Sequence, residues 1–193
     1  ATILPKDDSF DHSKMKDSKK FTSEKKIKEA ADYIKENAIA WAVHWEEAET
    51  IDTINIRQAV LKCMHRCVDT IIEKMPAAQY GHDNYFLLVD GNDFNPYIKV
   101  TSDDEDFISI PHNCIIKGDN TFSSIAAASI LAKVTRDNII EDMKVKYGDF
   151  GSGYPSDPKT KAFLKENWKK YPEIFRVTWS SYKKVAQPKL GDF

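Results

Sequence analysis

Two short apolar segments, each followed by an aspartate, constrain the fold of this chain most strongly. Residues 85–89 form an apolar run that stops at Asp90, and residues 114–116 form a second run that leads to Asp119. Both runs have the length and the apolar composition of buried strands. In open α/β sheets, ligands bind at the carboxyl ends of the strands. We therefore expect an α/β fold in which the two carboxylates lie at one edge of the sheet.

Hydrophobic periodicity predicts the remaining elements. A helix is expected from Ser123 to about residue 146, where Gly148 follows its end, and its alanines 126–128 allow close packing against a sheet. Another helix is expected to start at Thr22 or Ser23. Further helices are predicted over 53–74 and 159–170, and strands over 38–45 and 97–100.

The helix predicted over 53–74 has one apolar face and is expected to end at Pro76. The residues of that face are Ile56, Val60, Met64, Cys67, Val68 and Ile71. The alternation of strands and helices along the chain is typical of an α/β protein.

Composition favours one soluble globular domain over residues 1–193, with 159–193 as a C-terminal helical extension. The chain has 193 residues, of which 41% are hydrophobic and 30% charged, and a net charge of -2. This charge argues against a generally basic nucleic-acid-binding protein. Lysines nevertheless concentrate in 14–28 and 159–170, which permits a basic face.

The cysteine count and the hydropathy indicate the compartment. Three cysteines, without a secretory signal, predict reduced thiols and a cytoplasmic protein, or a nuclear one in a eukaryote. Cys63 and Cys67 are one helical turn apart, but a zinc site needs two more ligands, so we interpret them and Cys114 as core thiols. No apolar stretch has the length of a membrane span, and no membrane partner is expected.

Asp90 and Asp119 are the best candidates for metal ligands. Mg²⁺ and Mn²⁺ prefer hard oxygen ligands and bind through a few carboxylates, substrate phosphates and water. Such ions catalyse in-line phosphoryl displacement. The alternative is that each aspartate caps a loop or a helix, and Asp119 could cap the helix that begins at Ser123.

Several motifs occur together along the chain. They are Asp-Ser-Lys-Lys at 17–20, Ile-Asp-Thr-Ile-Asn-Ile at 51–56, Leu-Val-Asp-Gly at 88–91, Lys-Gly-Asp at 117–119, Ser-Ile-Ala-Ala-Ala-Ser-Ile-Leu-Ala-Lys-Val-Thr-Arg-Asp at 124–137 and Gly-Ser-Gly-Tyr-Pro-Ser-Asp-Pro at 151–158. In these motifs the chain resembles the ribonuclease HII family from residue 1 to about residue 185.

The resemblance implies a ribonuclease H-like fold, with a mixed sheet flanked by helices. It also implies an endonuclease that cleaves the RNA strand of RNA–DNA hybrids, and ribonucleotides embedded in duplex DNA, with Mg²⁺ or Mn²⁺ held by four carboxylates. Asp90 and Asp119 match the third and fourth carboxylates. Tyr154 matches a tyrosine that stacks at the RNA–DNA junction and helps sense the 2′-hydroxyl. Lys19 and Asn55 lie in motifs expected to contact the nucleic-acid backbone.

The chain departs from the family pattern at its start. The opening Asp-Glu-Ala-Gly-Arg-Gly motif, which supplies the first two carboxylates, is absent, and residues 1–5 align with the end of the second strand. We expect that this segment and the central first strand precede residue 1 in the complete protein. The 193 residues by themselves are therefore expected to show little or no cleavage.

Two alternatives remain at this stage. The chain could be a non-catalytic member of the family that binds nucleic acid or serves as a subunit, which predicts salt-sensitive binding without metal. It could also be an unrelated metal-dependent phosphotransferase with the same fold, because fold alone does not fix the reaction. Accessory subunits are left open.

Overall fold

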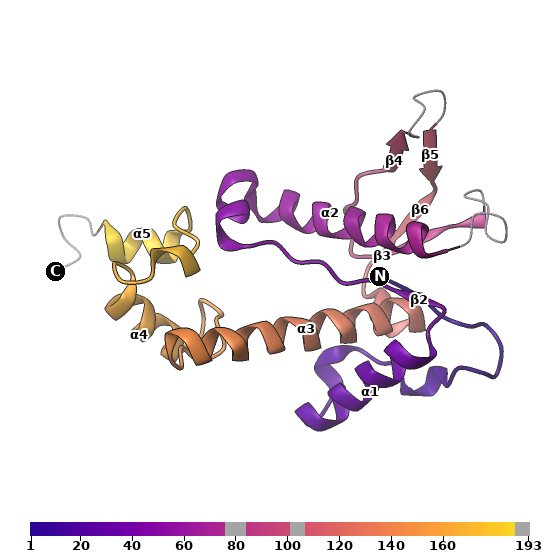
Figure 1. The fold of residues 1–193 in the computed structure, drawn as a ribbon, viewed down its shortest axis with the longest axis horizontal. Coiled ribbons are helices and arrows are strands. Elements are labelled where there is room, and N and C mark those ends of the chain that lie inside the picture. Colours follow the sequence, from indigo (N-terminus) through magenta and orange to yellow (C-terminus); the bar gives the residue numbers. More distant parts are fainter. Residues whose placement is uncertain (76–83, 101–106, 188–193) are drawn as a thin grey trace. The chain divides into compact units, whose positions relative to one another are not determined.

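The computed structural model describes residues 1–75, 84–100 and 107–187, which form a mixed α/β structure (Figure 1). Its strands are β1 (Thr2–Ile3), β2 (Ala40–Trp41), β3 (Leu87–Asp90), β4 (Tyr97–Val100), β5 (Phe107–Ile110) and β6 (His112–Ile115). Its helices are α1 (Glu24–Asn37), α2 (Ala48–Lys74), α3 (Ser123–Tyr147), α4 (Pro158–Asn167) and α5 (Ser180–Ala186).

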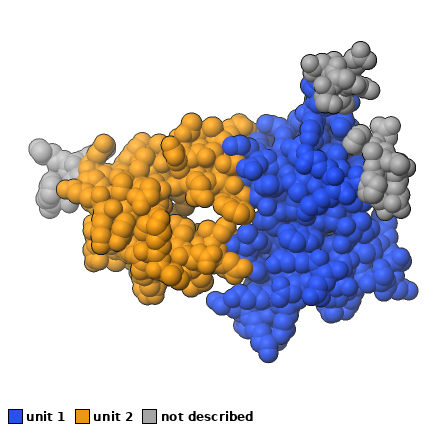
Figure 2. All heavy atoms as spheres, viewed as in Figure 1, with its two compact units in different colours: residues 1–44, 61–135 blue, residues 45–60, 136–193 orange. Residues whose placement is uncertain are grey.

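The chain divides into two compact units (Figure 2). Unit 1 comprises residues 1–44 and 61–135, and unit 2 comprises 45–60 and 136–193. The predicted C-terminal extension from residue 159 does not coincide with this division, and the single-domain assignment stays a prediction. No helix in the described part of the chain is both long and apolar enough to cross a bilayer.

The described strands pair two by two. β3 and β6 are parallel, with Val89 opposite Cys114 and Asp90 opposite Ile115, which confirms that both apolar runs end at the same edge. β4 and β5 are antiparallel, with Tyr97 opposite Ile110. The sequence predicted β4 but not β5, because the apolar strand Phe-Ile-Ser-Ile follows directly on an acidic run that we interpreted as a loop.

The strand predicted over 38–45 is shorter in the structure. β2 contains only Ala40 and Trp41, which pair antiparallel with β1. One further bond extends this ladder, from the Ala42 N–H to the Ala1 carbonyl at 3.0 Å. Residues 43–45 lie beyond the paired register, so their β propensity alone does not make a strand.

The core of unit 1 forms where α1 packs against the first half of α3. Ser23 caps α1 by accepting a hydrogen bond from the Lys26 N–H at 3.3 Å, as the sequence predicted. One face of α1 is buried, with Ile27, Ala30, Ala31 and Ile34, of which Ile34 is fully inaccessible. From α3, Ala127, Ile130 and Leu131 are also fully buried in the same cluster. The small side chain of Ala127 allows α3 to approach α1 closely, whereas the packing predicted for alanines 126–128 was against a sheet.

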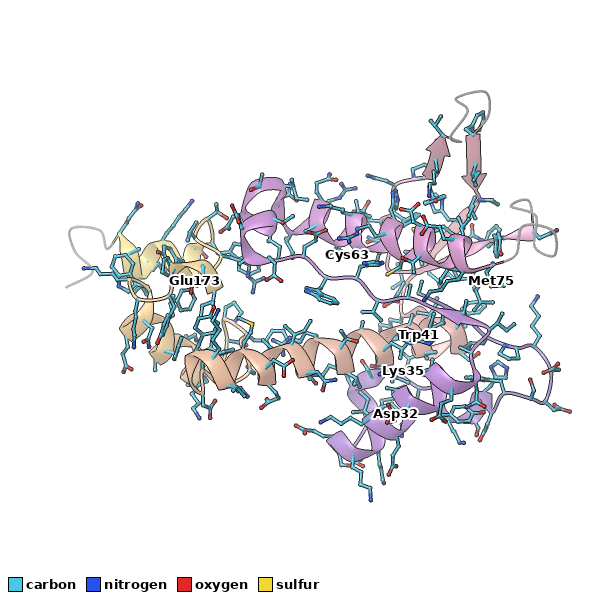
Figure 3. All side chains as sticks on the ribbon, viewed as in Figure 1. Asp32, Lys35, Trp41, Cys63, Met75 and Glu173 are labelled. Carbon is cyan, nitrogen blue, oxygen red and sulfur yellow. The ribbon has the colours of Figure 1, made fainter. Side chains whose placement is uncertain are left out.

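A Trp41–Lys35 contact joins α1 to β2 in the same unit. The indole N–H of Trp41 donates to the Lys35 carbonyl at 3.3 Å, and the Lys35 ammonium lies 5.9 Å from the indole centroid. Figure 3 shows these two residues, together with Asp32 on the exposed side of α1.

The helix α2 differs from its prediction at its first half. It is interrupted at Asn55, whose φ of 66° and ψ of 162° are not helical. Ile56 and Val60 are each 44% exposed, so their assignment to a buried face was wrong. Ala59 and Leu61 are buried beside them, and further along Cys67 and Val68 pack in two separate clusters. Pro76, the predicted helix end, lies outside the described residues.

The prediction that all three cysteines lie in the core is correct for only some of them. Cys67 is buried and Cys63 half-buried, but Cys114 is exposed, so its assignment to the core was wrong. Among the described strands, β6 pairs only with β3, and an edge strand buries fewer of its side chains.

Unit 2 is held together largely by aromatic contacts. Phe150 and Leu164 are buried in it. The ring of Phe163 lies 5.6 Å from that of Phe150 and 6.4 Å from that of Tyr171, and Tyr171 is 5.1 Å from Tyr147. Such ring pairs stabilise a small unit beyond the area that they bury.

Candidate nuclease site

The first carboxylate of the site, Asp90, is fixed by the turn that follows β6. Asp90 ends β3, and its Oδ1 accepts a hydrogen bond from the Gly118 N–H at 2.9 Å. Gly118 is buried, and a Cβ built on it would lie 2.5 Å from Ile125 Cδ1. A larger residue at this position would therefore have to displace Ile125, and with it the donor that orients Asp90.

The turn itself is strained at Lys117. This residue has φ 57° and ψ 39°, the left-handed conformation that L-residues other than glycine adopt at a cost of about 1 kcal/mol or more. The turn is closed by the Asn120 N–H, which donates to the Lys117 carbonyl at 3.1 Å. Asp119, half-buried, accepts from Asn120 Nδ2 at 2.9 Å and not from the first turn of α3. The capping alternative for Asp119 therefore does not apply within the described residues.

A second turn, distant in sequence, completes the site. Asp17 caps residues Ser18–Lys20 by accepting from the Lys19 N–H at 2.9 Å. Ser18 accepts from the Ser129 hydroxyl of α3 at 2.9 Å, and Lys20 Nζ donates to Asn120 Oδ1. These bonds hold the Lys19 segment beside the turn that carries Asp119.

The two turns and the end of β3 line one cavity of about 440 Å³. Its lining residues are Asp17, Lys19, Lys20, Asp90, Gly91, Lys117, Asp119 and Asn120. Three of the predicted site residues, Lys19, Asp90 and Asp119, thus lie together. Three lysines and three aspartates line this cavity, so it offers groups of both signs to a phosphate and a cation.

Asp90 and Asp119 fit a Mg²⁺ or Mn²⁺ ion as a partial ligand set. Both offer hard carboxylate oxygens to one cavity, and Mg²⁺ is commonly held by one or two carboxylates, substrate phosphates and water. No group of three or more His, Cys, Asp or Glu side chains placed to share a metal occurs among residues 1–75, 84–100 and 107–187. We expect a cation to bind weakly unless a phosphate completes its ligands.

Tyr154 lies in unit 2 and is held by Arg136. The tyrosine is 50% exposed, and the Arg136 guanidinium carbon lies 4.2 Å from its ring centroid. Arg136 also donates to the Ser152 carbonyl at 2.5 Å and pairs with Asp137 at 3.3 Å. One face of the ring is therefore covered by a cation while half of the residue remains accessible for stacking.

The loop that carries Tyr154 is organised by Asp157. Its carboxylate accepts from the Ser152 N–H at 2.6 Å and from the Lys159 N–H at 2.8 Å, which also caps α4. A Cβ on Gly151, whose φ is +77°, would lie 2.6 Å from this carboxylate. Glycine is required there because the carboxylate approaches the backbone so closely.

The loop that Asp157 organises is expected to lose stability in acid. The hydrogen bonds from Ser152 and then Lys159 hold the pKa of Asp157 well below its usual 3.8. A depressed folded-state pKa stabilises the folded loop above pH about 4, and this stabilisation is lost as the pH falls further. Asp157→Asn, which removes the charge and one acceptor, should lower the melting temperature at pH 6 and make less difference at pH 3. Asp142→Asn, at an exposed position of α3, is the control; an equal effect of Asp157→Asn at both pH values would contradict this prediction.

Asn55 and Asp52 organise the start of α2. Asn55 Oδ1 accepts from the Gln58 N–H at 3.1 Å and so caps the part of α2 that follows the break. Asp52 accepts from the backbone N–H groups of Val177 and Thr178 at 2.6 and 3.1 Å. Asn55 thus has a structural partner, and its predicted contact with nucleic acid stays a prediction.

Five residues of the cavity were not predicted as site residues. They are Asp17, Lys20, Gly91, Lys117 and Asn120. The first four lie inside the motifs quoted above and Asn120 directly follows Asp119, so proximity in sequence was the available signal. What the sequence did not contain was the contact between the two turns, which are about a hundred residues apart.

The chain is similar to several known proteins. The Ribonuclease HII family model matches residues 1–182. A Ribonuclease HII from Sulfurisphaera tokodaii is 34% identical over 177 residues, which cover 89% of this chain and 78% of the relative. Among solved structures, the ribonuclease H2 from Pyrococcus horikoshii OT3 has a TM-score of 0.64 at 30% identity, covering 88% of this chain and 78% of that one.

A second solved structure gives a similar match. In the PCNA:RNase HII complex from Archaeoglobus fulgidus, the matched chain has a TM-score of 0.60 at 28% identity, with 90% of this chain and 82% of that one covered. These matches confirm the predicted ribonuclease H-like fold.

Proposed function

The chain belongs to the ribonuclease HII family, and we propose that it is a metal-dependent endonuclease that cleaves the RNA strand of RNA–DNA hybrids and ribonucleotides embedded in duplex DNA. Membership makes the chain a hydrolytic endoribonuclease. The observation that carries the finer proposal is the cavity that joins Asp90, Asp119 and Lys19. The non-catalytic alternative has no support from the comparisons.

Different residues of the cavity would bind the cation and the phosphate. Asp90 and Asp119 would hold Mg²⁺ or Mn²⁺, which when bound supplies Lewis-acid polarisation and lowers the pKa of water. Lys19 and Lys117 would bind phosphate oxygens of the nucleic-acid backbone, which positions the strand without reading sequence. The Gly118 N–H keeps Asp90 oriented throughout, because it binds one carboxylate oxygen and leaves the other accessible.

The selectivity for ribonucleotides would come from the accessible face of Tyr154, which stacks on the junction and senses the 2′-hydroxyl. Asn55 would contact the backbone from the start of α2. Cleavage on the 5′ side of the ribonucleotide would leave a 5′-phosphate and a 3′-hydroxyl. We expect the protein to act in the compartment that contains the DNA, which is the cytoplasm or, in a eukaryote, the nucleus.

The test is cleavage of a labelled DNA duplex that contains one ribonucleotide. Asp90 and Asp119 are only two of the four carboxylates that the resemblance implies, so we expect slow cleavage. The assay therefore uses protein in excess over substrate, with millimolar Mg²⁺ or Mn²⁺. The duplex should be cut on the 5′ side of the ribonucleotide with either ion and remain intact in EDTA. An all-DNA duplex is the control. Cleavage of both duplexes alike, or cleavage that persists in EDTA, would refute the proposal.

Replacing Tyr154 should affect ribonucleotide cleavage selectively. Stacking of a base on an aromatic ring contributes about 1–3 kcal/mol, so Tyr154→Ala should slow cleavage at an embedded ribonucleotide about 10- to 100-fold. Tyr154→Phe keeps the ring over Arg136 and should lose less. Rates are measured at saturating protein. Equal losses for the two variants would show that the hydroxyl, and not the ring, carries the effect.

A further inference from the structure

Asn120 lies between a positive and a negative group of the cavity. Lys20 Nζ donates to its Oδ1, and its Nδ2 donates to Asp119 Oδ1 at 2.9 Å. Its backbone N–H closes the turn by donating to the Lys117 carbonyl at 3.1 Å. The amide therefore has a defined partner at each end, and its backbone is fixed between them.

An amide is suited to this position by its hydrogen-bonding chemistry. An ammonium group only donates and an ionised carboxylate only accepts, whereas an amide accepts at its oxygen and donates at its nitrogen. The neighbours therefore determine the orientation of the Asn120 amide. Both bonds involve a charged partner, and bonds of this kind are stronger than those between neutral groups.

The two partners of Asn120 have different tasks in the proposed reaction. Lys20 belongs to the capped turn Ser18–Lys20, which also carries Lys19, the predicted phosphate contact. Asp119 is a predicted metal ligand with one oxygen engaged by Asn120. The ammonium of Lys20 has three donors, of which one reaches Asn120, so it can bind a phosphate without releasing the amide.

We propose that Asn120 is a positioning residue that couples the phosphate-binding turn to the metal-binding carboxylate, through Lys20 on one side and Asp119 on the other. Ordering of Lys20 by a backbone phosphate then also orders Asn120 and Asp119, so that nucleic-acid binding prepares the cation site. This proposal rests on the proposed function and adds to it a residue that acts through Lys20 and Asp119.

A double-mutant cycle on Lys20 and Asn120 tests the coupling without requiring activity. The affinity for Mn²⁺ is measured from the loss of the electron paramagnetic resonance signal of free Mn²⁺, in the native chain, Lys20→Ala, Asn120→Ala and the double variant. Asn120→Ala should weaken Mn²⁺ binding about tenfold, as residues that orient metal ligands commonly do. The effect of Lys20→Ala on Mn²⁺ affinity should differ about threefold or more between the native background and the Asn120→Ala background.

Binding of an RNA–DNA hybrid in EDTA separates positioning from simple nucleic-acid contact. Asn120→Ala keeps every lysine, so its hybrid affinity and its salt dependence should change less than about twofold. Lys20→Ala should weaken binding and reduce the slope of log K against log salt by about 0.9, the value for one phosphate contact. The matched controls are Asn113→Ala on β6 and Lys25→Ala on α1, both exposed, which should leave the Mn²⁺ affinity unchanged.

Equal effects of Lys20→Ala in both backgrounds would show that the two residues act independently and would overturn the coupling. So would a loss of metal-free hybrid affinity in Asn120→Ala as large as its loss of Mn²⁺ affinity. These outcomes are distinct from a failure of the proposed function, which would appear as equal cleavage of ribonucleotide-containing and all-DNA duplexes or as cleavage that persists in EDTA. Thermal melting of each variant checks that the fold is retained.

Discussion

Replacing Asp119 by asparagine is expected to slow metal-dependent cleavage at an embedded ribonucleotide by about 10²- to 10³-fold. The substitution keeps the size of the side chain but removes the charge that would hold a divalent cation. A bound cation contributes several kcal/mol of charge stabilisation, and each 1.36 kcal/mol corresponds to a tenfold change in rate. The measurement is the single-turnover rate constant in saturating Mn²⁺, with protein in excess over substrate.

The same loss is expected for Asp90→Asn, because both carboxylates line one cavity. The matched control is Asp32→Asn, at a position of α1 where the side chain is 69% exposed and pairs with Lys35 (Figure 3). This control should cleave at the native rate. If Asp119→Asn retained more than about a tenth of the native rate, the carboxylate would not be a metal ligand in the reaction.

Replacing Leu131 by alanine is expected to give the largest loss of stability. Leu131 is fully buried on α3 in the cluster that includes Ile34 and Phe10. Removing a buried leucine costs about 2–5 kcal/mol, because apolar contacts are lost and a cavity remains. For a chain of this size, each kcal/mol shifts the melting temperature by roughly 2–4 °C. A thermal melt followed by circular dichroism should therefore show a decrease of roughly 5–15 °C.

Val145→Ala is the control on the same helix, since Val145 is 90% exposed. It should change the free energy of unfolding by less than about 0.5 kcal/mol. A similar decrease in the melting temperature for both variants would mean that the loss reflects helix propensity and not burial against α1.

The elements with strong local signals were predicted closely. α3 was expected from Ser123 to about residue 146 and spans Ser123–Tyr147, and the cap of α1 is Ser23, one of the two residues predicted for it. β4 has the predicted bounds. Periodicity and capping determine such elements locally, so a sequence is enough to find them.

Errors arose where the pairing partner of a strand, or a break within a helix, decides the structure. β5 forms because β4 lies beside it, and β2 is short because its pairing with β1 ends. Within α2, the break at Asn55 divides a pattern that reads as one continuous helix. Ile56 and Val60 keep helical spacing with the buried residues beyond them, but spacing does not specify what covers a face.

In the site, too, some features follow from the sequence and others from the tertiary structure. The sequence by itself determined that Asp90 and Asp119 follow two strands, and parallel pairing of those strands brings both to one edge. Only the tertiary structure decided that Lys20 meets Asn120, and that Lys19 and Lys117 line the same cavity as Asp90 and Asp119. The physical reason is that strand periodicity places successive residues of one segment, whereas a hydrogen bond between turns about a hundred residues apart depends on how the chain packs between them.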